Sequence, residues 1–246
     1  MSRYLFVCGT ARSGTSAMWR QLTRDPRIAL GLERYAELLK SEGLQPSLFE
    51  EDRFFDLRPR DTFYRDLEAF NPYYGEVRAR YADSEIRGDK IPSLFAHLDE
   101  ILAVFPEARV IVMVRNIFDI AASYERRADE GVHWPDNRRT NAAIKDWRRM
   151  LSAVSMYAED RRVLPVIYED FYFGQGNLRA LYDFLELDLT HRVEVAFRRT
   201  LERGAAREEA RSRDLSQEAV MNICLNAPFG QYRELVERIR SRPVAA

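Results

Sequence analysis

The segment from Gly9 to Ser16 reads Gly-Thr-Ala-Arg-Ser-Gly-Thr-Ser and has the composition of a loop that binds a phosphate. It follows a short apolar run and opens an amphipathic helical pattern, so backbone N–H groups and the positive end of a helix dipole can point at one anion. Its two glycines allow a tight turn and a close approach to the ligand. The alternative is an ordinary strand-to-helix turn that contains two glycines. The candidate phosphate-binding residues are Arg12, Ser13, Gly14, Thr15 and Ser16.

This loop differs from the triphosphatase pattern G-x-x-x-x-G-K-[ST] because Thr15 stands where the lysine belongs. The lysine contacts the β and γ phosphates, and its absence argues against hydrolysis of ATP or GTP. A cation stands earlier in the loop instead, at Arg12. At a later strand end, where a triphosphatase has an aspartate for magnesium, Val114 leads into Arg115. These residues favour a ligand whose charge is neutralised without a metal ion.

Arg115 is the centre of a second candidate anion site. It ends an apolar run, and Ser123 lies about two turns into the helical pattern that follows. An arginine fork with a serine hydroxyl suits a phosphate monoester. Because ligands of open α/β sheets bind at the carboxyl ends of the strands, Arg115 and the loop are expected at the same edge. The alternatives are a salt bridge from Arg115 to Asp119 and a plain polar helix position for Ser123.

The elements that must position these residues alternate between short apolar runs and longer helical patterns, which predicts a parallel sheet wrapped by helices. We expect an α/β, P-loop-like three-layer fold in one domain over residues 1–246, with a mostly parallel central sheet. The segment 44–85 has less regular periodicity and is expected to form an inserted helical substrate lobe. Its aromatic residues either line an apolar pocket or pack the lobe, and we favour packing; they include Phe54, Phe55, Phe63, Tyr64, Phe70, Tyr73 and Tyr74. Proline is tolerated near a strand start or at an edge, so Pro165 is expected near a beginning. The predicted strands are 4–8, 28–32, 109–114 and 163–168, and the predicted helices are 15–24, 34–41, 93–104, 117–129 and 140–160.

Composition narrows the class of protein. The chain of 246 residues has 38 basic and 39 acidic residues and a net charge of -1, which gives no reason to expect nucleic acid or an anionic membrane as a partner. Cys8 and Cys224 are far apart, and the three histidines show no metal-ligand spacing, so no metal site is expected. The N-terminal apolar run is too short for a signal peptide or a membrane span. The expected location is cytoplasmic, without stable membrane insertion.

The two motifs together resemble those of the PAPS-dependent sulfotransferases, where PAPS is 3′-phosphoadenosine-5′-phosphosulfate. Residues 12–16 resemble that family's 5′-phosphosulfate loop, and residues 110–123 are similar to its 3′-phosphate signature, with Arg115 and Ser123 holding the phosphate. Ile117 stands where many members have proline. The resemblance extends more loosely to about residue 190, through Tyr-Glu-Asp-Phe at 168–171. It implies transfer of a sulfuryl group from PAPS, with adenosine-3′,5′-bisphosphate (PAP) as the product.

The resemblance also implies catalytic residues beyond Arg12. Lys90 lies in Gly-Asp-Lys-Ile-Pro, an irregular segment before a helix that resembles a Lys-x-Pro element in which several relatives place a catalytic lysine. The alternative is a surface lysine paired with Asp89. An acceptor hydroxyl needs a general base, and Glu33, just after the second strand, is our choice. His133 is the alternative base. Arg203 and Arg207 are weak candidates for a basic loop that closes over the 3′-phosphate.

The acceptor is a hydroxyl or amine of a small molecule, carbohydrate or lipid, and the sequence does not choose among them. Two other functions share the same motifs. One is a nucleoside or small-molecule kinase, and the other is a nucleotide-binding protein without catalysis. The oligomeric state stays open.

Overall fold

A computed structural model describes residues 3–62, 71–131, 134–174, 177–208 and 215–242. In this part of the chain, five parallel strands form one sheet in the order β2-β3-β1-β4-β5. The strands are β1 (Arg3–Gly9), β2 (Ile28–Leu32), β3 (Ile86–Lys90), β4 (Arg109–Val114) and β5 (Val163–Ile167). The sheet is therefore wholly parallel, and its two central neighbours, β1 and β4, carry the two predicted anion motifs at their carboxyl ends.

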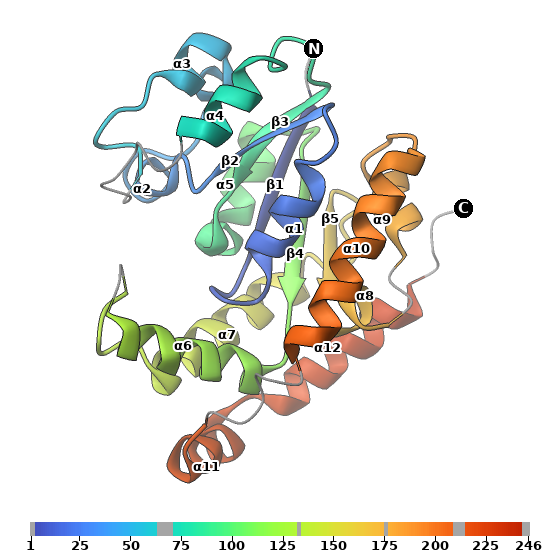
Figure 1. Ribbon diagram of the computed structural model, residues 1–246. Helices are drawn as coiled ribbons and strands as arrows, with labels where there is room; N and C mark the ends of the chain where they lie inside the picture. The colour runs from blue at the N-terminus through green and yellow to red at the C-terminus, as the bar shows by residue number, and fades with distance from the viewer. Residues whose placement is uncertain (1–2, 63–70, 132–133, 175–176, 209–214, 243–246) are drawn as a thin grey trace.

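Helices follow almost every strand (Figure 1). The α-helices are α1 (Thr15–Leu22), α2 (Ala36–Ser41), α3 (Glu51–Phe55), α4 (Asn71–Arg78), α5 (Leu98–Val104), α6 (Ile117–Glu130), α7 (Thr140–Met156), α8 (Tyr168–Tyr172), α9 (Leu178–Phe184), α10 (His191–Glu208), α11 (Gln217–Asn226) and α12 (Phe229–Ser241). The 3₁₀ helices η1 (Pro46–Phe49) and η3 (Pro92–His97) accompany them in the described residues. None of the helices in the described ranges is long and apolar enough to cross a membrane.

The alternation of side chains along the strands separates two apolar cores. On β1, Leu5 and Val7 pack with α1, α8, α9 and α10, whereas Phe6 and Cys8 pack with α5, α6 and α7. A strand buried on both faces must be apolar where it is buried, and β1 and β4 meet this requirement after their first residues, Arg3 and Arg109. The result is the three-layer arrangement that the sequence predicts, with helices on both faces of the sheet.

Four predicted strands are confirmed within one or two residues, but the sequence prediction for the segment around Lys90 is wrong. Residues 86–90 are not irregular; they form β3, which lies between β2 and β1. The segment Ile-Arg-Gly-Asp-Lys has little β-propensity, so local pattern does not reveal it. Gly88 is required here, because a Cβ at this position would lie 1.7 Å from Leu5 O on the neighbouring strand.

The predicted helices are confirmed with small changes at their ends. The predicted helix 93–104 is divided into η3 and α5, and the helix predicted at 140–160 ends at Met156. Tyr168, predicted as the end of a strand, instead begins α8. Pro165 lies in the middle of β5, where it is tolerated because β5 is an edge strand.

The described residues of the lobe form η1, α3 and α4, joined by turns, and their aromatic side chains pack against one another. Phe54 stacks on Tyr81 with ring centroids 4.9 Å apart. The ring centroids of Phe49 and Phe54 are 6.5 Å apart. Figure 1 shows the α-helices of the lobe, α3 and α4, on the β2 side of the sheet. Phe63, Tyr64 and Phe70 lie outside the described residues. For the described aromatic residues, packing is therefore their role, as the sequence predicts.

A buried ion pair ties this lobe to the end of β2. Arg34 is 1% exposed, and its Nη1 lies 2.6 Å from Oδ2 of Asp61. Arg34 also donates to the carbonyl oxygens of Phe54 and Asp56 at 3.0 and 2.8 Å. Burial by itself raises the pKa of Asp61, but the hydrogen bonds from Arg53 and Arg34 outweigh it and hold that pKa below its usual value. The lobe is thus fastened by charge-assisted hydrogen bonds as well as by apolar packing.

Replacing Asp61 by asparagine should lower the free energy of unfolding by about 3 kcal/mol, because it leaves the buried Arg34 guanidinium without its counter-charge. Urea unfolding followed by circular dichroism measures this. The matched control is Glu42→Gln. Glu42 pairs with Arg60 across 3.5 Å, and the Arg60 side chain is 84% exposed. Losing this exposed pair should cost less than about 1 kcal/mol. Equal losses in the two variants would show that the buried pair does not stabilise the fold.

Candidate functional site

The loop between β1 and α1 has the backbone of an anion-binding turn. Gly9, Arg12 and Gly14 have positive φ angles of 142°, 67° and 99°. Ser13 N–H donates to Thr10 O at 3.0 Å within the loop. The N–H groups of Gly14, Thr15 and Ser16 donate to no acceptor in the described part of the chain. Three consecutive donors at the start of a helix are what a phosphate requires.

Both glycines of the loop stand where a side chain does not fit. A Cβ at Gly9 would lie 2.5 Å from Met113 O, and a Cβ at Gly14 would lie 2.4 Å from the Tyr168 ring. Arg12 adopts the left-handed conformation without being glycine, which costs about 1–3 kcal/mol. The surrounding structure therefore fixes this loop in a conformation that its own residues do not favour.

Arg115 lies against this loop, as the strand-end position predicts. Its Nη1 donates to Arg12 O at 3.4 Å, and its Nη2 lies 3.0 Å from Oδ2 of Asp119. The guanidinium also lies over the Tyr168 ring, 4.1 Å from the centroid. The salt bridge that was the alternative explanation of Arg115 is thus present, and the same arginine also contacts the loop.

Ser123 joins the two motifs directly. Its Oγ accepts a hydrogen bond from Nε of Arg12 at 2.8 Å. A serine hydroxyl that accepts from an arginine still has its own proton to donate to an anion. The Arg12 guanidinium and the Ser123 hydroxyl, far apart in sequence, therefore lie side by side and can contact the same ligand.

Asn116 and Glu169 support Arg115, and the sequence analysis did not assign them to the site. Asn116 caps α6 by accepting from Asp119 N at 2.9 Å, and its Nδ2 donates to Asp119 Oδ2 at 2.9 Å. Glu169 Oε1 accepts from Asn116 N at 3.0 Å and from Asn116 Nδ2 at 2.7 Å. Asparagine before a helical run is an N-cap signal, and Glu169 lies in the Tyr-Glu-Asp-Phe segment, so both residues had a sequence signal.

The loop after β1, Arg115 and Ser123 line one cleft of about 420 Å³. Five arginines and two acids contribute to its wall, which makes it suited to an anionic ligand. Arg20, Arg126, Arg127 and Tyr168 are cleft residues that the sequence analysis did not select. The residues around the cleft are Arg12, Gly14, Thr15, Ser16, Ala17, Arg20, Leu32, Glu33, Arg115, Asp119, Ala122, Ser123, Arg126, Arg127 and Tyr168.

Glu33 and Lys90 meet at the wall of the cleft. Nζ of Lys90 donates to Oε1 of Glu33 at 2.5 Å, and Glu33 N donates to Lys90 O at 2.8 Å. The Lys90 side chain is 1% exposed and that of Glu33 is 13% exposed. Lys90 is therefore not the surface lysine paired with Asp89 that was its alternative explanation. Glu33 is the member of the pair that lines the cleft.

The remaining candidates are placed differently. Ser13 is buried beneath the loop; its Oγ has no hydrogen-bond partner among the described residues, and it does not line the cleft. His133 lies outside the described residues, as do the side chains of Arg203 and Arg207. In the described part of the chain, no group of three His, Cys, Asp or Glu residues could hold a metal ion.

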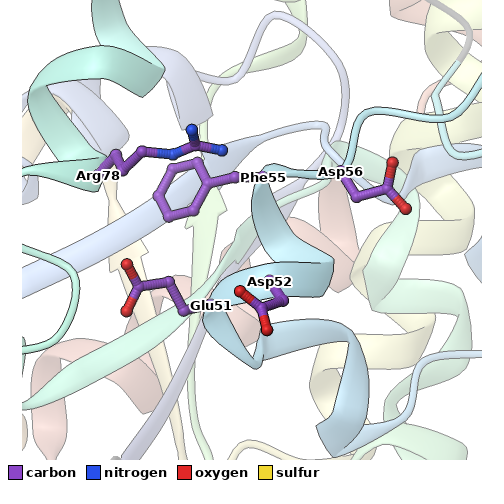
Figure 2. A pocket seen from close by; sticks show the side chains of 5 residues that line it. All are labelled: Glu51, Asp52, Phe55, Asp56 and Arg78. Carbon is purple, nitrogen blue, oxygen red and sulfur yellow. The ribbon is translucent and has the colours of Figure 1, made fainter.

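A second hollow of about 340 Å³ lies on the lobe, between α3 and α4. Figure 2 shows the Arg78 guanidinium over the Phe55 ring, with the carboxylates of Glu51, Asp52 and Asp56 around them. None of the residues selected from the sequence for chemistry lines it.

Comparisons with solved structures agree with this fold. The sulfotransferase domain from the curacin biosynthetic pathway is 20% identical, with a TM-score of 0.52 over 78% of this chain and 77% of that one. The sulfotransferase domain of the Synechococcus PCC 7002 olefin synthase is 18% identical, with a TM-score of 0.51 over 100% and 90% of the two chains. Mouse sulfotransferase SULT7A1 complexed with PAP is 15% identical, with a TM-score of 0.54 over 98% and 86%. At these identities the likeness shows the fold alone.

The sequence itself carries the family assignment. A search of curated proteins found no match. The sequence profile of the sulfotransferase family, however, matches residues 5–191, which is most of the chain and includes both anion motifs. The chain belongs to the sulfotransferase family, whose enzymes use PAPS as the sulfuryl donor.

Proposed function

We propose that this chain transfers the sulfuryl group of PAPS to a hydroxyl or amine of a small-molecule, carbohydrate or lipid acceptor. One observation carries the proposal: four residues of the loop, Arg12 and residues 14–16, line a single cleft with the Arg115–Ser123 pair, and Glu33 lines the same cleft. PAPS has two phosphate-bearing positions, which require two anion sites within one ligand's length. The cleft offers both.

The residues present fit such a donor. The N–H groups of Gly14, Thr15 and Ser16 donate to no protein acceptor in the described ranges, and Gly14 lets the loop pack against the Tyr168 ring, where a Cβ would not fit. These groups suit the 5′-phosphosulfate, and Arg115 with Ser123 suits the 3′-phosphate. Ser13 contributes through the turn that it closes with Thr10, since its side chain is buried.

The chain's own residues account for the chemistry that transfer requires. PAPS, when bound, supplies the activated sulfuryl group. Arg12 lines the cleft and Lys90 lies behind Glu33 at its wall, so both offer fixed positive charge near the place where negative charge must be stabilised. Glu33 is the group that takes the proton of the acceptor, because its carboxylate lines the cleft. His133 remains the alternative base.

Binding experiments separate this function from its two rivals. Calorimetry with PAP in the absence of magnesium should give a binding signal, whereas a kinase would instead require ATP with magnesium. Transfer is measured with ³⁵S-labelled PAPS against 4-nitrophenol, a mixture of monosaccharides, a primary amine and a fatty alcohol, with water as the baseline acceptor. A chain that binds PAP but transfers to none of these, water included, would be a binding protein without catalysis.

Replacing Arg115 by alanine should weaken PAP binding about 10- to 100-fold, because a charge-assisted hydrogen bond is worth about 1.5–3 kcal/mol. Calorimetry measures the dissociation constant. Arg109→Ala is the matched control. Arg109 is the first residue of β4, so it lies at the end of the strand away from the cleft, and it pairs with Glu186 there. An Arg115 variant that binds PAP as well as the Arg109 variant does would rule out the second anion site.

Replacing Glu33 by glutamine should lower the turnover number about 10²- to 10⁴-fold, because the general base is lost. Lys90→Ala should also lower turnover, and both variants should keep the dissociation constant for PAP within about threefold. His133→Ala is measured beside them. If the His133 variant loses turnover about 10²- to 10⁴-fold and the Glu33 variant keeps the wild-type rate, His133 is the base and the assignment of Glu33 is wrong.

Replacing Gly14 by alanine should reduce PAP affinity at least tenfold, because the new Cβ would overlap the Tyr168 ring and displace the loop. Gly43→Ala controls for backbone strain, since Gly43 has a φ of 77° and nothing within 4 Å of the added Cβ. Calorimetry with PAP and thermal unfolding are measured for both. Similar affinities would show that the contact between loop and ring does not shape the donor site.

A further inference from the structure

Asp89 is a buried carboxylate that the proposed chemistry does not use. It stands at the end of β3, one residue before Lys90, and is 0% exposed. Successive residues of a strand face opposite sides of the sheet. Asp89 pairs in register with Phe6 and Lys90 with Val7, so the two side chains lie on opposite faces. Burying an ionisable group is costly unless it is bound, so its partners indicate its role.

Both oxygens of Asp89 bind the turn that follows Glu33. Oδ1 accepts from Arg34 N at 3.1 Å, and Oδ2 accepts from Tyr35 N at 2.8 Å. Asp89 does not line the cleft, and its carboxylate is occupied by these backbone donors. It therefore cannot reach an acceptor as a base, and any effect that it has on the reaction passes through the turn.

The turn needs such support because Glu33 is held in an unfavourable conformation. Glu33 has a φ of 55°, in the left-handed region that non-glycine residues avoid. Three hydrogen bonds to β3 fix this turn: Glu33 N to Lys90 O, and the two from Arg34 N and Tyr35 N to Asp89. With the backbone fixed in this way, the Glu33 carboxylate meets Nζ of Lys90.

Gly31 provides the space for this arrangement. It lies opposite Asp89 in the pairing of β2 with β3. A Cβ at Gly31 would lie 2.7 Å from Asp89 Oδ1 and 2.6 Å from Arg34 Cβ. Burial raises the pKa of Asp89 to about 6, although the N–H groups of Tyr35 and Arg34 act to lower it. Each carboxylate oxygen accepts from one of these backbone donors.

We propose that Asp89 is a positioning residue for sulfuryl transfer, which holds Glu33 in the left-handed conformation that brings its carboxylate to Lys90 at the cleft. This inference rests on the proposed function. An asparagine at this position keeps one acceptor but turns an amide N–H₂ toward the second backbone donor. The turn then loosens and Glu33 loses its place, whereas the donor site on β1 and β4 is untouched.

Asp89→Asn should lower the turnover number about 10- to 100-fold at saturating PAPS and leave the dissociation constant for PAP within twofold. Turnover is measured with the acceptor that the screen identifies, or with water. In a Glu33→Gln background, the same Asp89→Asn change should cost less than threefold, because its effect passes through Glu33. Equal losses in the two backgrounds, or a parallel loss of PAP affinity, would overturn the proposal.

Asp25→Asn is the matched control. Asp25 is a buried carboxylate that also accepts from a backbone N–H, that of Arg27, but it precedes β2 and so lies at the opposite end of that strand. This variant should lose stability without losing turnover. Gly31→Ala tests the turn with Asp89 itself intact, and it should reproduce the loss of turnover with PAP binding retained. A folded Gly31→Ala protein with unchanged turnover would contradict the inference.

The wild-type protein offers a measurement that depends neither on these variants nor on activity. The amide hydrogens of Arg34 and Tyr35 should be among the slowly exchanging amides in hydrogen exchange followed by NMR. Rapid exchange at both positions would refute the positioning role even if every variant failed to fold. If the wild-type chain neither binds PAP nor transfers sulfuryl groups, the proposed function fails, and the exchange result still decides whether Asp89 holds the turn.

Discussion

The backbone pairing of β1 with β4 is the constraint on which the site depends. Gly9 and Met113 are partners in this ladder, and the contact at Gly9 is too close for any side chain. The loop after β1 therefore leaves the sheet beside the residues that follow β4. A parallel sheet places both carboxyl ends at one edge. The two anion motifs, about a hundred residues apart in sequence, converge because the strands that precede them are hydrogen-bonded neighbours.

The cations of the cleft are held in place by protein groups. Arg12 donates to Ser123, Arg115 is bound to Asp119 and lies on Tyr168, and Lys90 donates to Glu33. Asp119 is itself oriented by Asn116, which Glu169 holds in turn. Side chains fixed in this way lose little conformational freedom when an anion arrives. Arg12 and Glu33 are both left-handed, as is Glu186 outside the cleft, so the surrounding structure holds these backbones in an unfavourable conformation.

Sequence predicted those parts of the fold that have a strong local signal. The apolar runs of β1, β2, β4 and β5 and the glycine loop were found because periodicity and glycine spacing act over a few residues. The strand β3 was missed, since Arg-Gly-Asp-Lys is a strand only through its neighbours on both sides. The Glu33–Lys90 contact spans 57 positions and could not be derived from spacing. The resemblance brought Lys90 forward, and the resemblance together with its position after the second strand brought Glu33 forward. The burial of Ser13 beneath its loop likewise depends on Gly9 and the adjacent strand, and the role of His133 stays a prediction.

Arg34 links the lobe to the proposed base. Its backbone N–H is bound by Asp89, one residue from Glu33, while its guanidinium is bound by Asp61 and by carbonyl groups of the lobe. A change in the lobe that displaces Asp61 therefore also displaces the Arg34 side chain and, through its backbone, the turn that holds Glu33. A variant that reshapes the lobe has to keep the Arg34–Asp61 pair if Glu33 is to keep its position.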